Sequence, residues 1–390
     1  MGDFVKEEPM EGGSASSTSK LECRFKDQSL FKTLLQCSGS IQPDLITFRV
    51  RENSMSYVGI DSSHCALVNW ELGREAFENY YATTDEENEN GDKEFLISVD
   101  LELMNKILKI CKSKDSVHLR YNSEDKPDVL EVTLLDPRGE QAIAPKEEEG
   151  AGSAGNKKAK QSRGGAAPRL NQFSITVKPH CGDRSLELPP SKEDCYHIQL
   201  PKDCFRYAQE NLMELSVSDQ KHATVFMACP REPIRDSRTG NVKKCDVVRF
   251  GSQNQSGAMA IDFLVAESLE EKKPKQEMPA DAPAAPLTSA KVFLTRKEGF
   301  DDQSKCRFSN KWVSKIGLGL PIIENVQIEL ATEYPAIFIC PISEGMGVLR
   351  WVVSPHLGTE EEGAADGEGD GGAAAADDDV FAEEDEFSDG

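Results

Sequence analysis

Basic side chains recur opposite the apolar stripes of the helices that the sequence predicts. They are Lys32, Lys106, Lys109, Arg206, Lys311 and Lys315. Ammonium and guanidinium groups spaced in this way can hold phosphate oxygens without reading bases. In an ordinary globular protein the same pattern describes only a solvated helix face, so the spacing alone favours solvation.

Motifs for enzymatic chemistry are missing from the sequence. There is no P-loop, no GxSxG, no HExxH and no paired-carboxylate signature, and the six histidines are spread singly along the chain. The 11 cysteines include no CxxC pair and are typical of reduced thiols in a cytosolic or nuclear protein. We therefore expect neither catalysis, nor a metal site, nor a cofactor.

Length and charge set the broad class. The 390 residues suffice for two or three domains, and the apolar content of 38% predicts that part of the chain is linker and tail. The net charge is −23, of which the stretch from Gly358 to Gly390 supplies −14, leaving −9 elsewhere. An acidic body still permits DNA contact through one local basic surface. The N-terminus has no apolar signal core, and no run is long enough to span a membrane.

The elements that would position the basic residues follow from periodicity. Apolar residues at helical spacing predict helices at Asp27–Ser38, from an N-cap at Asp100 to about Lys112, at Pro201–Leu212 and near Asn310–Leu320. Alternating patterns predict strands at Leu45–Arg51, Met55–Ile60, His64–Leu72, Phe95–Val99, Ser116–Tyr121, Val129–Leu135, Gln172–Lys178, Tyr196–Leu200, Thr224–Cys229, Val247–Gly251, Met259–Val265, Lys291–Thr295, Val326–Leu330, Ala336–Cys340 and Val348–Val353. The plan of helix, strands, helix, strands occurs twice. The expected fold class is α+β, with two helices on an antiparallel sheet in each of two tandem domains.

The stretch Tyr57–Trp70, YVGIDSSHCALVNW, is predicted to be a strand, a tight turn and a second strand. Asp61, Ser62 and Ser63 favour the turn, because short polar side chains bond back to their own backbone. The pattern places His64 at the start of the second strand. Taken alone, this histidine is most simply a half-buried strand residue.

Four segments, in order, resemble the eukaryotic sliding clamps of the proliferating cell nuclear antigen family. They are IDSSHCALV, VDLELMNKILKICKSKDSVHLRY, LELPP and YPAIF…GVLRWVVSPHL, within a likeness that covers about Gln28 to Leu357. The long insertions, Glu210 on a helix face that is usually basic, and Val352 in place of an aromatic residue all depart from the family. These departures indicate a divergent member, from a large DNA virus or a protist.

The predicted domain organisation combines the likeness with composition. The first clamp domain is expected at 21–136, after a disordered tail at 1–20, and it is followed by a disordered insertion at 137–168. The end of the first domain and a connecting loop are expected at 169–194. The second domain is expected at 195–357, with insertions at 230–244 and 267–288, and an acidic disordered tail follows at 358–390. The tail sequence DDDVFAEEDEF favours simple solvation, with a bait for basic partners or an internal competitor as the alternative.

The resemblance implies a non-enzymatic ring that encircles duplex DNA without sequence preference and acts as a processivity factor. The helix lysines and arginine would then face DNA. The implied partners are DNA polymerase, a clamp loader and clients of the flap endonuclease and ligase type, in the nucleus or a viral replication compartment. The implied groove for their peptides is lined by Ile60, His64, Cys65, Leu67, Leu186, Leu188, Pro189, Pro335, Val353, Ser354, Pro355 and Leu357.

Assembly is expected to be a homotrimer formed through strand edges. By position, the edge strands are Val129–Leu135 and Asp246–Gly251, with Val132, Leu134, Val248 and Phe250 at the interface. The alternative is a scaffold of the same fold that does not encircle DNA alone, either one subunit of a heteromeric checkpoint clamp or a monomeric viral processivity factor.

Overall fold

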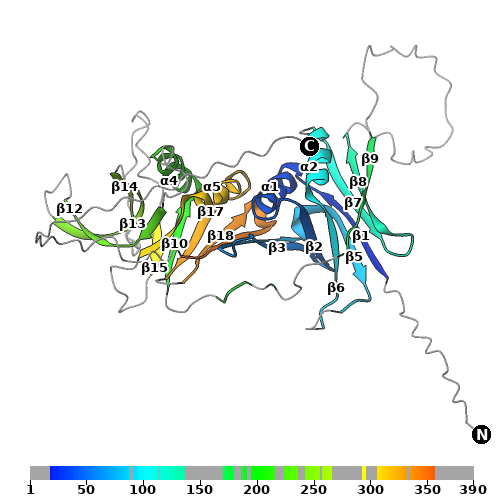
Figure 1. Ribbon diagram of the computed structural model, residues 1–390, viewed down its shortest axis with the longest axis horizontal. Coiled ribbons are helices and arrows are strands. Elements are labelled where there is room, and N and C mark those ends of the chain that lie inside the picture. Colours follow the sequence, from blue (N-terminus) through cyan, green and yellow to red (C-terminus); the bar gives the residue numbers. More distant parts are fainter. Residues whose placement is uncertain are drawn as a thin grey trace, which may run out of the picture. The chain divides into compact units, whose positions relative to one another are not determined.

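A computed structural model describes most of the chain between residues 18 and 355 (Figure 1). The described ranges are 18–87, 91–112, 114–136, 170–179, 186, 188–190, 195–215, 224–235, 242–254, 257–265, 292–295, 305–331 and 334–355. The predictions for residues 1–17, for the acidic tail, for the insertions at 137–168 and 267–288 and for Leu357 therefore fall outside the described residues. The last residues of the tail predicted at 1–20 are described, and Ser19 and Lys20 lie in a strand, not in a disordered tail.

Four helices occur in the described ranges, where the periodicity predicted them. They are α1 (Gln28–Gly39), α2 (Leu101–Ile110), α4 (Lys202–Leu215) and α5 (Asn310–Gly317). The N-cap carboxylates start the first two, since Asp27 accepts a hydrogen bond from the Ser29 N–H at 2.7 Å and Asp100 accepts one from the Leu103 N–H at 2.8 Å. Short 3₁₀ turns lie at Arg74–Ala76, Leu320–Ile322 and Ser343–Gly345.

The first sheet has the strand order β5-β1-β7-β8-β9. Its strands are β1 (Ser19–Phe25), β5 (Phe77–Thr84), β7 (Ser116–Asn122), β8 (Lys126–Leu135) and β9 (Leu170–Thr176). Strands β1 and β5 were not predicted from the sequence. Their outer residues are mostly charged or polar, and the apolar residues on their buried faces are Leu21, Cys23, Phe25, Phe77, Tyr80 and Ala82.

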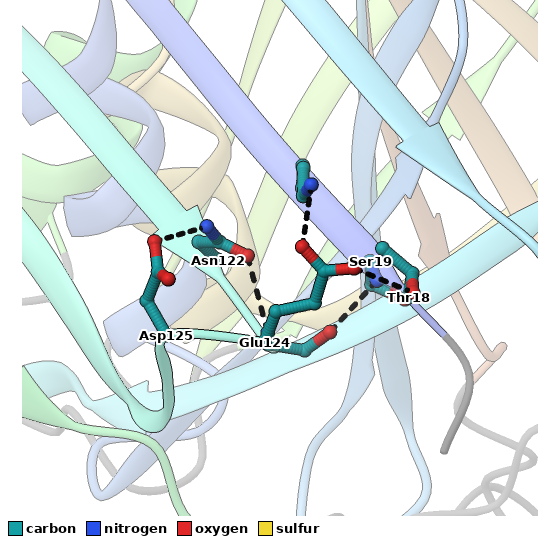
Figure 2. A network of polar contacts seen from close by, with 7 residues as sticks. Thr18, Ser19, Asn122, Glu124 and Asp125 are labelled. Carbon is teal, nitrogen blue, oxygen red and sulfur yellow. Dashed lines mark hydrogen bonds and ion pairs between the residues drawn. The ribbon is translucent and has the colours of Figure 1, made fainter. Parts of the chain in front are cut away.

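A polar network joins the β7–β8 turn to the start of β1 (Figure 2). Glu124 in the turn accepts a hydrogen bond from Thr18 and forms an ion pair with Lys20, whose Nζ lies 2.7 Å from its carboxylate. Ser19 and Ser123 exchange two hydrogen bonds of 2.8 and 2.9 Å. The β7–β8 turn therefore also fixes where the first strand begins.

A nine-stranded antiparallel sheet joins the two halves of the chain, in the order β15-β10-β17-β18-β19-β4-β3-β2-β6. Its strands are β2 (Leu45–Arg51), β3 (Ser54–Ile60), β4 (Ala66–Gly73), β6 (Glu94–Asp100), β10 (Tyr196–Pro201), β15 (Phe293–Thr295), β17 (Asn325–Leu330), β18 (Ala336–Ile342) and β19 (Gly347–Val353). The seam is the pairing of β4 with β19, from Ala66 opposite Val353 to Leu72 opposite Gly347.

The third sheet belongs to the second half of the chain. Its strands are β11 (Thr224–Ala228), β12 (Arg231–Arg235), β13 (Val242–Asn254), β14 (Gly257–Leu264) and β16 (Lys305–Ser309), in the order β12-β13-β11-β16 with β14 also paired to β13. The helices lie on one side of the sheets (Figure 1). They bury the predicted stripes, including Phe31 and Leu34 of α1, Met104 of α2 and Phe205 of α4.

Candidate partner-binding groove and helix face

Alternate residues of the nine-stranded sheet point away from the helices and form an apolar row on its outer face. The register aligns Ile60, Leu67, Val352 and Ile337 across four neighbouring strands. Three of them, Leu67, Val352 and Ile337, form a separate cluster and are each 6% exposed. Because strand residues alternate between faces, this row is independent of the core beneath it.

Two leucines of the LELPP segment cover this row. Leu186 and Leu188 pack against the cluster, together with Val58, Tyr334 and Ile339. Side chains of both halves hold the segment: the Tyr334 hydroxyl donates to the Pro190 carbonyl at 2.7 Å, and Arg49 donates to the Leu186 carbonyl at 3.5 Å. The connecting segment, the first half and the last strands thus meet at one apolar surface.

One predicted lining residue is wrong. Val353 is fully buried in the main core, on the helix side of β19. The residue that joins the outer cluster is its neighbour Val352, because adjacent strand residues face opposite sides of a sheet. Ile337 and Tyr334 were also missed from the sequence, although the alternation in YPAIFI would have placed Ile337 and Ile339 on the same face.

The DSSH turn forms one rim of the groove and differs from the prediction at His64. Strand β4 begins only at Ala66, and His64 lies in the turn with a left-handed φ of 55° and an exposed side chain. Histidine tolerates this conformation better than a β-branched residue. The turn therefore projects His64 and the exposed thiol of Cys65 into solvent beside Ile60, not into the start of a strand.

Asp61 organises this turn. Its carboxylate accepts hydrogen bonds from the N–H groups of Ser63, Cys65 and Ala66, at 3.2, 2.8 and 2.7 Å, and from the Ser63 hydroxyl. Burial acts to raise the pKa of Asp61, but the hydrogen bonds from Ser63, Ala66 and Cys65 outweigh it, so the pKa lies below its ordinary value. The ionised carboxylate is the form that the turn requires.

The end of the described chain lies against the same turn. The Ser354 N–H donates to the Cys65 carbonyl at 2.8 Å. Pro189, Pro335, Ser354 and Pro355 are all half-buried. Next to Ile60 is a hollow of about 470 Å³, which is lined from the other side by residues 41–45, Thr47 and Ser62. The apolar row is therefore continued beside Ile60 by an open hollow.

On the helix side, two of the predicted DNA-contacting lysines are engaged within the protein. Lys32 donates to the Cys111 carbonyl at 3.0 Å, and Lys315 donates to the Ser40 carbonyl at the C-terminal end of α1. Burial, with the nearby Lys311, lowers the pKa of Lys315. Its ammonium group complements the negative end of the α1 dipole and ties the two halves together.

The other basic residues on the helices are exposed, but acidic neighbours offset some of them. Lys106 lies 2.7 Å from Glu102, and Arg206 lies 3.4 Å from Asp203 on α4. Lys109 is exposed, and Lys311 is exposed with its Nζ 4.2 Å from the Trp312 ring centroid. The helix side is therefore only sparsely basic, with its least balanced charges on α2 and α5.

Comparison with known proteins bears on the fold and the family of the chain. The family model for the N-terminal domain of proliferating cell nuclear antigen matches residues 20–146. Proliferating cell nuclear antigen of Saccharomyces cerevisiae is 26% identical over 342 residues, which are 87% of this chain and 100% of that protein. Together these matches support a sliding clamp of the proliferating cell nuclear antigen family.

Two further matches are to part of a sliding clamp and, for the fold, to a solved structure. The DNA polymerase sliding clamp of Thermoplasma acidophilum is 27% identical over 95 residues, and the match spans 23% of this chain and 35% of that protein. The crystal structure of the Entamoeba histolytica family member superposes with a TM-score of 0.55 at 15% identity, over 86% of this chain and 98% of that one. The fold is therefore that of a clamp, and the family is one of non-enzymatic scaffolds.

The clamp strands that we predicted to be free edges are not edges. Strand β8 pairs with β7 on one side and β9 on the other, and β13 pairs with β11 and β12 on one side and β14 on the other. The four predicted interface residues are accordingly core residues, at most 1% exposed: Val132, Leu134, Val248 and Phe250. The insertion at 137–168 hid the real order, because it separates β8 from its hairpin partner β9.

Strands β9 and β14 each pair on one side only among the described strands, so each is one edge of its sheet; the opposite edges are β5 and β16. Both carry exposed apolar residues at one end: Leu170 is 56% exposed and Leu264 is 53% exposed. The described residues include no helix long and apolar enough to cross a membrane, and no cluster of three His, Cys, Asp or Glu suited to a metal ion.

Proposed function

We propose that the chain is a DNA sliding clamp, a nuclear processivity factor that closes into a homotrimeric ring around duplex DNA. It would tether a polymerase, and it would recruit loader, flap endonuclease and ligase type clients through short peptides. The observation that carries this proposal is the apolar row on the outer sheet face, which Leu186 and Leu188 partly cover while it stays open beside Ile60. A row of this kind suits an amphipathic peptide with aromatic anchors.

The helix side supports the DNA part of the proposal. Exposed lysines on α2 and α5 and Arg206 on α4 offer sequence-independent phosphate contacts, and the acidic neighbours Glu102 of Lys106 and Asp203 of Arg206 keep those contacts weak. Weak contacts suit sliding. Replacing Lys106 and Lys109 should lower the salt slope of DNA binding by about 0.9 for each phosphate that these lysines no longer neutralise.

The groove is tested by calorimetric titration of a synthetic clamp-binding peptide with two aromatic anchors. Leu186→Ala with Leu188→Ala removes several partly buried methylene groups at roughly 0.8 kcal/mol each, so at least a tenfold loss of affinity is expected. The matched control is Leu103→Ala with Ile110→Ala, because these residues are exposed on α2 and lose comparable apolar groups there. Equal affinities for the wild type and the groove variant would refute the groove assignment.

The ring is tested at β9 and β14. The Val177 and Val265 N–H groups bond inward to Asp128 and Asp246, so by alternation the N–H groups of Ser174 and Ala260 point outward from each edge. Pairing of β9 with β14 of the next subunit would use these outward groups.

Ser174→Pro with Ala260→Pro removes two outward donors and leaves the internal ladders intact. Light scattering should give a trimer for the wild type and for the control Ser174→Ala with Ala260→Ser, and a monomer for the proline variant. If the wild-type chain is a monomer, the result supports the alternative hypothesis, in which the chain is a scaffold of the same fold that does not encircle DNA by itself.

A further inference from the structure

The outer face of the nine-stranded sheet changes from apolar to polar between β18 and β17. Two rows of side chains cross β18, β17, β10 and β15, which are neighbours in the sheet (Figure 1). The register of the first row is Ile337, Glu329, His197 and Thr295, and that of the second is Ile339, Gln327, Gln199 and Phe293. The apolar row of the proposed groove therefore continues, without a break in the sheet, as polar rows on the second half of the chain.

The polar ends of both rows line a hollow of about 220 Å³, together with Ile339. Because Ile339 also packs against the outer apolar cluster, the hollow adjoins the proposed groove. Neighbouring strands lie about 4.8 Å apart, so two strand spacings place His197 roughly 10 Å from Ile337. An extended peptide covers this distance in about three residues. A client peptide anchored on the apolar row is therefore long enough to place its flank in the hollow.

Glu329 supplies the negative charge of the hollow. Its side chain is only 15% exposed, and a carboxylate in such a place interacts more strongly with a cation than one in open solvent does. Nδ1 of His197 lies 3.9 Å from Oε1 of Glu329, which is longer than a hydrogen bond. An ionised carboxylate can accept about four hydrogen bonds, so Glu329 can accept an incoming N–H group in addition to the contacts it already makes.

The other lining groups suit a cation as well. Gln199 and Gln327 lie directly opposite each other on neighbouring strands, and their amide oxygens are hydrogen-bond acceptors. Phe293 on the outermost strand is 44% exposed, and an accessible ring face attracts an ammonium or guanidinium group. Among the described residues that line the hollow there is no lysine or arginine to repel such a group.

We propose that this hollow binds a lysine or arginine side chain in the flank of a client peptide whose aromatic anchors occupy the groove. The inference rests on the proposed recruitment of clients and adds a charge requirement to it, a basic residue roughly three to five residues from the anchors. The net charge of −23 favours a basic flank in the same direction. Among clients with equal anchors, those with the basic residue would bind the clamp more tightly.

The test is a double-mutant cycle, measured by calorimetric titration of synthetic peptides into the full chain. The peptides share two aromatic anchors and carry either lysine or glutamine at one position, about two to six residues beyond the anchors on either side. At one or more of these positions, lysine should raise the affinity about three- to tenfold over glutamine, as a partly buried ion pair would. Glu329→Gln should abolish this gain.

The matched variant is Glu131→Gln on β8 of the first sheet. Its carboxylate is 16% exposed, close to the 15% of Glu329, so the same charge is removed from a similar strand environment far along the chain. This variant should keep the full gain from lysine. The glutamine peptides should bind both variants like the wild type, which also shows that the groove is still folded.

The proposal is overturned if lysine gives no gain at any position, or if the gain survives in Glu329→Gln. An equal loss of the gain in both variants would also overturn it, because net charge alone would then explain the effect. Tighter binding of a peptide with glutamate at the same position would assign the hollow to an anion instead. Failure of the groove itself is seen separately, as glutamine peptides that do not bind the wild type or that ignore Leu186→Ala with Leu188→Ala.

Discussion

The two faces of the nine-stranded sheet are built from the same strands but are used differently. On β19, the inward residues Leu349, Trp351 and Val353 are fully buried beneath the helices. Of the outward residues, Val352 lies in the outer apolar cluster, and Arg350 donates to Asn69 of β4 at 3.0 Å. The difference shows that burial alone does not separate core from docking surface, since Val352 is only 6% exposed. What covers the residue decides its role.

The largest effect should come from the inward face. Trp351→Ala removes a fully buried indole that pairs across the strands with Phe338. Loss of such a side chain leaves a cavity and costs about 3–5 kcal/mol of the free energy of unfolding. Urea unfolding at room temperature measures this loss. A loss below about 1 kcal/mol would mean that the two faces differ less than their packing indicates.

An intermediate effect is expected at the DSSH turn, which joins the faces at one edge of the groove. Asp61→Ala leaves the buried Ala66 N–H and the Cys65 N–H without their acceptor, which should cost roughly 1–3 kcal/mol of unfolding free energy. The matched variant Asp61→Asn keeps one acceptor oxygen and should lose less. If both variants unfold like the wild type, the turn is held by other contacts.

The sign of the pH dependence at this turn follows from the lowered pKa of Asp61. A folded-state pKa below the unfolded value of about 3.9 gives stability that is present above that value and is lost as the pH falls through the folded pKa. The wild type should therefore lose this contribution on acidification, and Asp61→Asn should not. Urea midpoints at neutral pH and below the unfolded pKa of about 3.9 measure the difference.

The smallest effect on folding should come from the outward face. Val352→Ala removes two methyl-sized groups from a shallow cluster and should cost less than about 1.5 kcal/mol of unfolding free energy. Affinity for the two-anchor peptide should nevertheless fall severalfold, because the deleted surface lies in the groove. Because Trp351 and Val352 are neighbours in sequence on opposite faces, the two variants compare a loss of folding stability with a loss of peptide affinity. A Val352→Ala protein with unchanged peptide affinity would remove this residue from the groove.

Local pattern predicted the helices, and the family likeness pointed to the leucines of LELPP. Asp100 could be assigned as an N-cap because its type and the apolar spacing after it agree. Leu186 and Leu188 could be assigned to the groove from the family likeness, and both pack on the outer cluster. These features depend on residues close together in sequence.

The sequence was a poorer guide to which strands pair with each other and to which face of the sheet a residue near a strand end lies on. Val132 and Val248 alternate correctly as strand residues, but only the three-dimensional pairing shows that β9 and β14 cover their strands. Val353 was placed one residue out of phase, and an error of one residue reverses the face. The bonds of Lys32 and Lys315 to distant carbonyls have no local signal at all.

The pairing of β4 with β19 also determines when, during synthesis on the ribosome, this part of the sheet can be completed. The hydrogen bond between Asn69 and Arg350 joins residues 281 positions apart. At about 5–20 residues per second, a ribosome needs roughly 14–56 s to make the intervening chain. During that time the partner β3 of strand β4 has been made but β19 has not, so one edge of β4 stays open to other chains. The last strand made is therefore the one that closes the first half of the chain.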